Sequence, residues 1–203
     1  MLLPLAINSE RLSEPLIFQY RPVAKTKTLL LDRDGVLNRV LLRGSEVSSP
    51  RSQDEFLLSE DISALAETSI IDDWNLVIIS NQPDIARGRI NLDLLEYINH
   101  SIRTNIPLNA SYICPHMASD GCRCRKPKTG LIERFKNDFP QVAGKMVLIG
   151  DRDSDRECAE RAGVGFILRR REYNSQCANS VEHSIKSLFD LLPLLRRLFP
   201  DSG

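Results

Sequence analysis

The sequence carries no excess of charge of either sign, since its 203 residues include 27 lysines and arginines against 27 aspartates and glutamates. Nucleic-acid binding depends on many cationic contacts to phosphates, so this balance argues against a nucleic-acid partner. It also argues against an enzyme that processes the ends of nucleic acids. No apolar run reaches the roughly 20 residues of a membrane span. Residues 1–7 are apolar, but Pro4 interrupts them and no basic segment precedes them, so we expect no secretory signal.

Cysteine and histidine are also scarce, with five and three residues respectively. An odd number of cysteines does not form a fully paired disulfide framework, and we expect a reducing, cytoplasmic location. Four of these eight residues nevertheless lie within eleven positions: Cys114, His116, Cys122 and Cys124. A chance grouping of reduced thiols with one histidine is the alternative to a metal site.

The close pairs C-x-H and C-x-C supply the Cys₃His set of a closed tetrahedral zinc site. Because four protein ligands leave no position for a metal-bound water, we expect this zinc to be structural. It would hold an irregular loop and present Arg125 and Lys126, which follow directly, from a fixed position.

The fold class follows from short apolar runs that alternate with helical periodicity. This pattern predicts an α/β fold: a single, mostly parallel, Rossmann-like sheet with helices on both faces. We expect one domain over 26–203, preceded by an N-terminal extension over 1–25 that packs on the body or on a second subunit. Expected strands cover 28–31, 76–79, 110–113, 146–149 and 164–168. Expected helices cover 59–71, 91–102, 130–139, 154–162 and 181–199, the last kinked at Pro193.

Polar residues stand at the ends of three of these strands. D-R-D-G occupies 32–35, S-N-Q occupies 80–82, and G-D-R-D-S-D occupies 150–155. Each segment alone is an ordinary turn or helix cap, but their occurrence together, each after an apolar run, is informative. Ligands of open α/β sheets bind at the carboxyl ends of the strands, so these residues predict one site.

The residue types at this edge indicate phosphoryl transfer. Asp32, Asp34 and Asp151 would place several carboxylates in a small volume, which requires a cation, and Mg²⁺ is the natural hard partner. Phosphoryl transfer depends on positioning and charge neutralisation. Asp32 would attack phosphorus, and Asp34 would protonate the leaving oxygen and then deprotonate water. Ser80 and Lys126 would bind the equatorial oxygens.

The three segments L-L-L-D-R-D-G-V-L-N, S-N-Q-P-D-I-A-R-G and C-P-H…C-R-C-R-K-P-K resemble motifs of the haloacid dehalogenase superfamily of phosphatases. The resemblance covers roughly residues 27–168. Within the superfamily it is strongest to the subfamily of D-glycero-D-manno-heptose-1,7-bisphosphate 7-phosphatases and histidinol-phosphate phosphatases. Membership implies a zinc loop in place of a large cap domain.

The resemblance also implies a role for each matched residue. Asp32 is the nucleophile and Asp34 the general acid and base, while Ser80 and Lys126 stabilise the phosphoryl group. The implied substrate contacts are Asn81, Gln82, Arg125 and Arg152. The implied Mg²⁺ ligands are Asp32, the main-chain oxygen of Asp34, and Asp151.

Features of the sequence favour different substrates. I-A-R-G at 85–88 resembles the heptose enzymes, whereas the short loop between His116 and Cys122 and the G-D-R-x-x-D segment resemble the histidinol-phosphate enzymes. The polar segment by which heptose enzymes contact substrate is absent from 39–43.

We expect D-glycero-D-manno-heptose 1,7-bisphosphate, because Arg125, Lys126 and Arg152 offer more cationic contacts than a monophosphate needs. Histidinol phosphate is the alternative, and a non-catalytic scaffold of the same fold is a third reading. The expected partner is therefore a small phosphorylated metabolite, with no nucleic acid and no membrane, bound to a monomer.

Overall fold

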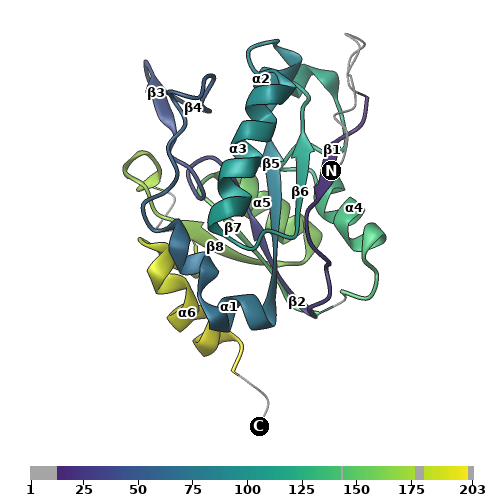
Figure 1. Ribbon diagram of the computed structural model, residues 1–203, viewed down its shortest axis with the longest axis vertical. Helices are drawn as coiled ribbons and strands as arrows, with labels where there is room; N and C mark the ends of the chain where they lie inside the picture. The colour runs from purple at the N-terminus through teal and green to yellow at the C-terminus, as the bar shows by residue number, and fades with distance from the viewer. Residues whose placement is uncertain (1–12, 143, 177–180, 201–203) are drawn as a thin grey trace.

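A computed structural model describes residues 13–142, 144–176 and 181–200. A seven-stranded sheet lies at its centre, in the order β1-β6-β5-β2-β7-β8-β9 (Figure 1). Every neighbouring pair is parallel except β1 with β6. The bounds are β1 Leu16–Gln19, β2 Lys27–Leu31, β5 Trp74–Asn81, β6 Ala110–Cys114, β7 Met146–Gly150, β8 Gly165–Arg169 and β9 Ser184–Ile185. This order confirms the predicted, mostly parallel α/β sheet.

The central strands are buried on both faces, because successive side chains of a strand point to opposite sides. Leu29 and Leu31 of β2 pack on one face, where α1 (Thr68–Asp73), α3 (Leu92–Asn105) and α6 (Leu191–Leu198) cover the sheet. Leu30 packs on the other face, under α4 (Gly130–Asp138) and α5 (Asp153–Ala162). Two apolar cores therefore enclose the sheet, one under the helices on each of its faces.

The ends of the longest helices follow from local sequence. The Asn91 side chain accepts a hydrogen bond from Leu94 N at 2.9 Å, which caps the start of α3. Helix α5 ends at Gly163, whose φ of 65° lies in the left-handed region that glycine tolerates. Both helices were predicted from their periodicity.

Two predicted helices are wrong as single elements. The segment expected as one helix over 59–71 is a 3₁₀ helix, η1 (Ile62–Ala66), followed by α1, with an extended residue, Glu67, between them. The segment expected over 181–199 contains β9, a 3₁₀ helix η5 (Leu188–Asp190) and α6. Pro193 lies in the first turn of α6, where proline is tolerated, so it produces no kink in the way we expected.

Three further features were not predicted. Residues 16–19, within the expected N-terminal extension, form the antiparallel edge strand β1 on β6 of the same chain. Residues 74–75, which precede the expected strand over 76–79, belong to β5. A small antiparallel hairpin, β3 (Leu41–Arg43) with β4 (Glu46–Ser48), stands clear of the main sheet in Figure 1.

Charged contacts hold the hairpin to the segment that follows it in the chain. Arg43 Nη2 contacts Glu55 Oε2 at 2.5 Å, and Glu55 also accepts a hydrogen bond from Arg51 N at 2.6 Å. Arg51 Nε contacts Asp84 Oδ2 at 2.7 Å in the short helix α2 (Pro83–Ala86), which follows β5. The hairpin is thus held beside the carboxyl ends of the strands.

Among the helices that the structure describes, none combines the length and apolar character needed to cross a membrane.

Candidate active site and metal centre

The register of the sheet brings the three polar strand ends together. Leu31 of β2 pairs with Ile78 of β5 and with Ile149 of β7, so the residues that follow these positions share one edge. Asp32 N donates a hydrogen bond to Ile149 O at 2.9 Å, which fixes the first turn after β2. The residues that follow β2, β5 and β7 therefore lie close together at one edge of the sheet.

Three buried carboxylates, from Asp32, Asp151 and Asp155, have oxygens that all lie within 4.8 Å of one another. Lys126 lies beside them: its Nζ is 2.8 Å from Asp32 Oδ1 and 2.6 Å from Asp155 Oδ1. Nζ also donates to Ile79 O at 2.8 Å. Asp155 was not among the predicted site residues. The signal for it was its position one helical turn after Asp151, at the end of the G-D-R-D-S-D segment.

One ammonium does not balance three carboxylates in a buried volume, and the pKa values reflect this. Burial raises the pKa of Asp32 to about 6, although the charge of Lys126 opposes the rise. Burial, with the charges of Asp32 and Asp155, raises the pKa of Asp151 to about 8. Burial alone would lower the pKa of Lys126, but the two carboxylates that it contacts raise it. The cluster is thus short of positive charge.

The donor set of this cluster suits a hard divalent cation, because it consists of carboxylate oxygens close enough to share one ion. The backbone permits the close approach only with glycine at position 35. Gly35 has a φ of 88°, and a Cβ there would collide with Asp151 Oδ2 and with the Tyr173 hydroxyl. The D-x-D-G turn is therefore shaped by the residues it faces.

The Asp34 carboxylate is not a member of this group of three, and it accepts hydrogen bonds on both oxygens. Oδ1 accepts from Arg33 and from Asn38 Nδ2 at 2.9 Å, and Oδ2 accepts from Gln82 Nε2 at 2.6 Å and Ser49 Oγ at 2.8 Å. Burial would raise the pKa of Asp34, but the Arg33 charge and these hydrogen bonds outweigh it and hold the pKa below its ordinary value. Its side chain is a well-held carboxylate.

Arg33 and Gln82 form the buried support of that carboxylate. Neither side chain has exposed surface. Arg33 Nη2 donates to Gln82 Oε1 at 2.7 Å, and Gln82 Nε2 donates to Ser80 Oγ at 2.9 Å as well as to Asp34. Sequence reasoning named Gln82 as a substrate contact and did not assign a role to Arg33. The geometry links both to the placement of Asp34 and Ser80.

The predicted substrate contacts lie around this core. Asn81 is bonded to the main chain of Lys126 through both ends of its amide. Arg125 is half-buried, and its Nη1 donates to His116 O over a long 3.4 Å. Arg152 is exposed and reaches Val47 O of the hairpin at 3.2 Å. Arg125 thus follows the Cys₃His segment directly, and Arg152 lies at the start of α5.

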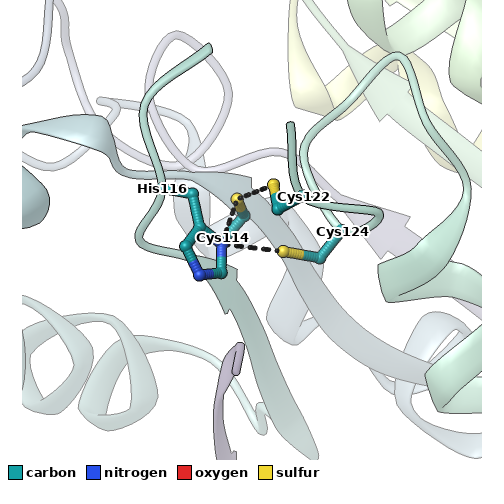
Figure 2. A group of neighbouring side chains, drawn as sticks. All are labelled: Cys114, His116, Cys122 and Cys124. Carbon is teal, nitrogen blue, oxygen red and sulfur yellow. Dashed lines mark hydrogen bonds between the residues drawn. The ribbon is translucent and has the colours of Figure 1, made fainter. Parts of the chain in front are cut away.

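The residues predicted as metal ligands, Cys114, His116, Cys122 and Cys124, come together as Figure 2 shows. Cys114 Sγ lies 3.7 Å from Cys122 Sγ and 3.5 Å from His116 Nδ1, which is 3.1 Å from Cys124 Sγ. Tetrahedral ligands with metal–sulfur bonds of about 2.3 Å are separated by about 3.8 Å. These distances, with all four ligand atoms within 4.8 Å of one another, suit the binding of one shared metal ion.

The ionisation of Cys114 and Cys124 is coupled. Hydrogen bonds from Cys124, then from His116 and Cys122, lower the pKa of the Cys114 thiol to about 5 despite its burial, whereas the contact with Cys114 and burial raise the pKa of Cys124. Thiolate is the form of cysteine that binds a metal. Of the remaining cysteines, Cys158 is buried on α5 and donates to Lys128 O at 3.3 Å. Cys177 lies outside the described residues.

Tyr173 is a site residue that sequence reasoning missed. Its hydroxyl donates to Asp151 Oδ2, and the neighbouring Asn174 donates from Nδ2 to Asp151 O at 2.7 Å and Arg169 O at 2.9 Å. The segment after β8 therefore supports Asp151. No motif in the sequence marks this contact, because the two residues are separated by a helix and a strand.

Comparison with known proteins gives consistent results. A family model described as HAD-hydrolase-like matches residues 123–188. A probable D-glycero-D-manno-heptose-1,7-bisphosphate 7-phosphatase of Thermoplasma acidophilum is 30% identical over 148 residues, which are 70% of this chain and 89% of that protein. The D-glycero-alpha-D-manno-heptose-1,7-bisphosphate 7-phosphatase of Campylobacter jejuni is 31% identical, covering 71% of this chain and 82% of its own length.

A relative of the same description from Burkholderia mallei is 29% identical over 88% of this chain and 98% of that protein. Among solved structures, the D,D-heptose 1,7-bisphosphate phosphatase of B. bronchiseptica, complexed with magnesium and phosphate, superposes with a TM-score of 0.70. It is 23% identical, and the match covers 85% of this chain and 99% of that one. At this identity the likeness shows the fold.

Proposed function

Because the chain belongs to the haloacid dehalogenase superfamily of phosphatases, we propose that it hydrolyses a phosphate ester of D-glycero-D-manno-heptose 1,7-bisphosphate. The observation that carries the proposal is a cluster of three carboxylates and one ammonium at the carboxyl ends of β2 and β7, formed by Asp32, Asp151, Asp155 and Lys126. Asp34 follows Asp32 by two positions in the chain. Such a grouping is suited to binding and transferring a phosphoryl group.

In the first step, a carboxylate oxygen of Asp32 attacks phosphorus, and the bond between phosphorus and the sugar oxygen breaks. An aspartyl-phosphate forms on Asp32. Asp34 is a carboxylate in the free protein. The negative charge of a bound phosphate ester raises its pKa, so Asp34 takes up a proton and gives it to the departing sugar oxygen, and the sugar leaves as an alcohol. Lys126 Nζ, which lies 2.8 Å from Asp32 Oδ1, stabilises the charge on the phosphoryl oxygens in this step.

In the second step, the Asp34 carboxylate takes a proton from water, and the water oxygen attacks the phosphorus of the aspartyl-phosphate. The bond to Asp32 breaks, the Asp32 carboxylate is restored, and inorganic phosphate leaves. Ser80 binds a phosphoryl oxygen through its hydroxyl, whose orientation Gln82 sets by donating to it at 2.9 Å. The network of Arg33 and Gln82 keeps Asp34 in reach for both proton transfers.

Two metal ions fit the residues present. Asp32, Asp151 and the main-chain oxygen of Asp34 would hold Mg²⁺, and Asp155 joins the same group of carboxylates. When bound, Mg²⁺ neutralises charge on the carboxylates and on the transferring phosphoryl group. Cys114, His116, Cys122 and Cys124 would hold a structural Zn²⁺, since their ligand atoms lie close enough to share one ion and the set leaves no open position.

The sugar bisphosphate is preferred as substrate because the chain offers two arginines near the site in addition to Lys126. Lys126 belongs to the reacting phosphate, whereas Arg125 and Arg152 extend from the loop before it and from the start of α5. Guanidinium groups bind phosphate oxygens bidentately. The curated relatives named above act, by their names, on the same class of compound.

A phosphate-release assay of the purified protein with Mg²⁺ tests the proposal. The substrates are heptose 1,7-bisphosphates of both anomers, histidinol phosphate and common sugar monophosphates. We expect the highest kcat/KM with a heptose bisphosphate. Faster turnover of histidinol phosphate than of every sugar bisphosphate would replace this substrate by the alternative, which the short zinc-predicted loop favours. No release from any phosphate ester would leave the scaffold reading.

A further inference from the structure

A cavity of about 590 Å³ lies beside the catalytic edge of the sheet. It opens between the turn after β2, the residues before η1, and the segments that follow β8 and β9. None of the catalytic carboxylates lines it, nor does Lys126, but Gly35 and Tyr173 do. Cavities of roughly 300–1,000 Å³ are of the size that holds a small ligand.

The lining is cationic. Arg39, Arg169, Arg171 and Lys186 face two carboxylates, those of Glu60 and Asp61. Arg39 pairs with Glu60, and Arg169 Nη2 pairs with Asp61 Oδ2 at 2.6 Å. Within the part of the chain that the structure describes, Arg171 and Lys186 have no carboxylate at ion-pair distance. The cavity therefore has two positive charges more than negative ones.

Three consecutive arginines occupy 169–171, and two of them line this cavity. Arg169 is only 2% exposed. Arg171 is half-buried, and its Nε donates to Gly35 O at 2.8 Å. Burial and the nearby charge of Arg171 lower the pKa of Arg169. Two guanidinium groups thus stand close together in a partly desolvated place, where an anion would relieve their repulsion.

We propose that this cavity binds a phosphate group, either as free inorganic phosphate or as part of a phosphorylated metabolite. Arg171 and Lys186 supply the uncompensated charge, and arginine offers several N–H donors in one plane to phosphate oxygens. The hydroxyls of Ser187 and Tyr173 also line the cavity, but each already donates its one proton, to Asp61 and Asp151 respectively, so the guanidinium and ammonium groups are the donors to the phosphate. A dianion matches the excess of two positive charges.

The occupant of this cavity is linked to the catalytic edge through two contacts. Tyr173 donates to Asp151, and Arg171 donates to the main-chain oxygen of Gly35 in the D-x-D-G turn. A ligand that draws either side chain toward itself alters the support of a residue in the carboxylate cluster. Binding in the cavity and events at the cluster are therefore coupled, and by thermodynamic linkage the coupling acts in both directions.

Equilibrium binding of inorganic phosphate to the full chain in the presence of Mg²⁺ tests the site without any need for activity. We expect two classes of site in the wild type, one at the carboxylate cluster and one in the cavity. Lys186→Ala should weaken one class at least fivefold and leave the other unchanged. Arg170→Ala is the matched control, because it removes a positive charge from the neighbouring exposed position that does not line this cavity. A single class in the wild type, or two classes unaffected by Lys186→Ala, would overturn the proposal.

Kinetics distinguish the two sources of the phosphate group. If the ligand is free phosphate, it should change kcat for a monophosphate substrate in the wild type, and Lys186→Ala should abolish this effect while retaining competitive product inhibition. If the ligand is the distal phosphate of a bisphosphate substrate, Lys186→Ala should raise KM for the bisphosphate and not for the monophosphate. Binding that is lost in Lys186→Ala with neither kinetic change would refute the coupling through Tyr173 and Arg171.

Discussion

The side-chain amide of Asn81 is hydrogen-bonded at both ends to the main chain of Lys126: Oδ1 accepts from Lys126 N at 3.0 Å, and Nδ2 donates to Lys126 O at 3.0 Å. The two residues come from different parts of the chain, one at the end of β5 and the other just after the Cys₃His loop. The amide therefore fixes the position from which Lys126 extends its ammonium toward Asp32 and Asp155.

Asn81→Ala should lower kcat by about 10- to 30-fold, because two hydrogen bonds of about 1 kcal/mol each hold the Lys126 main chain. Steady-state kinetics of the single variants Asn81→Ala and Lys126→Ala and of the double variant provide the measurement. If Asn81 acts through Lys126, its loss should have little further effect once Lys126 is alanine. Equal effects of Asn81→Ala in both backgrounds would contradict the positioning role and favour a direct contact with substrate.

Substitution of the two aspartates of the D-x-D-G turn should separate activity from stability. Asp32→Asn should reduce turnover by roughly 10⁴- to 10⁶-fold, as for loss of other nucleophiles. It should not lower the melting temperature, because it removes one of three buried like charges. Asp34→Asn should reduce turnover by roughly 10²- to 10⁴-fold.

Asp34→Asn should in addition lower the melting temperature. Each hydrogen bond to the Asp34 carboxylate comes from a donor, so one half of an asparagine amide would present N–H groups to N–H or O–H groups. Phosphate release and thermal unfolding of both variants are the measurements. Near-normal release by Asp32→Asn would rule out the covalent mechanism, and equal melting temperatures for both variants would contradict the role of the Asp34 network.

The sheet and the meeting of the strand ends could be predicted from sequence because each depends on a local pattern. Buried parallel strands such as β2 and β7 are continuous apolar runs, and parallel strands bring their carboxyl ends to one edge. The segment 59–71 shows where such patterns fail. Its apolar spacing is helical and the apolar side chains of Ile62, Leu65 and Ile70 are buried, yet the backbone is extended at Glu67. Periodicity reports which side chains are buried, and the backbone between them is decided by tertiary packing.

The site was incomplete in prediction for a related reason. Asp155 lies one helical turn from Asp151 and could have been found from that spacing. Tyr173 reaches Asp151 because β8 pairs in parallel with β7, so the segment after β8 lies beside the end of β7. Arg33 occupies the middle position of D-x-D, where its side chain is fully buried and hydrogen-bonds to Asp34 and Gln82. Contacts of this kind depend on the packed structure and leave no trace in local sequence.

Cys122→Ser should lower the melting temperature and release zinc, since zinc ligation contributes about 10–16 kcal/mol of apparent binding free energy in small sites. Activity should fall with it, because the loop that ends at Lys126 would lose its anchor. Elemental analysis and thermal unfolding provide the measurements. Cys158→Ser is the control: this thiol is buried but lies outside the cluster, so zinc content should stay at one per chain. Wild-type protein that contains no zinc after expression with the metal would contradict the assignment.

Asp61 should make stability depend on pH in the acid range. Its carboxylate accepts from Arg169 at 2.6 Å and from Leu188 N and Ser187 Oγ at 2.8 Å each. Burial would raise its pKa, but these hydrogen bonds outweigh it and lower the pKa in the folded state. A depressed pKa adds stability above the unfolded value of about 3.9, and this contribution is lost as the pH falls below that value.

Asp61→Asn should therefore destabilise the protein at neutral pH by about 3–5 kcal/mol, because it leaves the buried Arg169 without its counter-charge. The difference from wild type should shrink as the pH falls below about 4. Denaturant unfolding of both proteins from pH 3 to pH 7 is the measurement. A difference that is constant over this range would show that the charge of Asp61 does not contribute.

Arg125 and Lys126 should affect different kinetic constants, although they are neighbours in the chain. Lys126 Nζ lies within 2.8 Å of Asp32, so Lys126→Ala should lower kcat by roughly 10²- to 10³-fold for every phosphate ester. Within residues 13–142, 144–176 and 181–200, the side-chain hydrogen bond of Arg125 is the long one of 3.4 Å to His116 O, and its other N–H donors can bind a distal phosphate. Arg125→Ala should raise KM for a heptose bisphosphate at least tenfold and change KM for the corresponding monophosphate little.

The exposed Arg123, two residues earlier in the same loop, is the control for a general loss of positive charge, and Arg123→Ala should leave both KM values unchanged. An equal rise in KM for bisphosphate and monophosphate in Arg125→Ala would place this arginine at the reacting phosphate. The distal group would then be bound elsewhere, and Arg152, which reaches the hairpin from the start of α5, would be the next side chain to substitute.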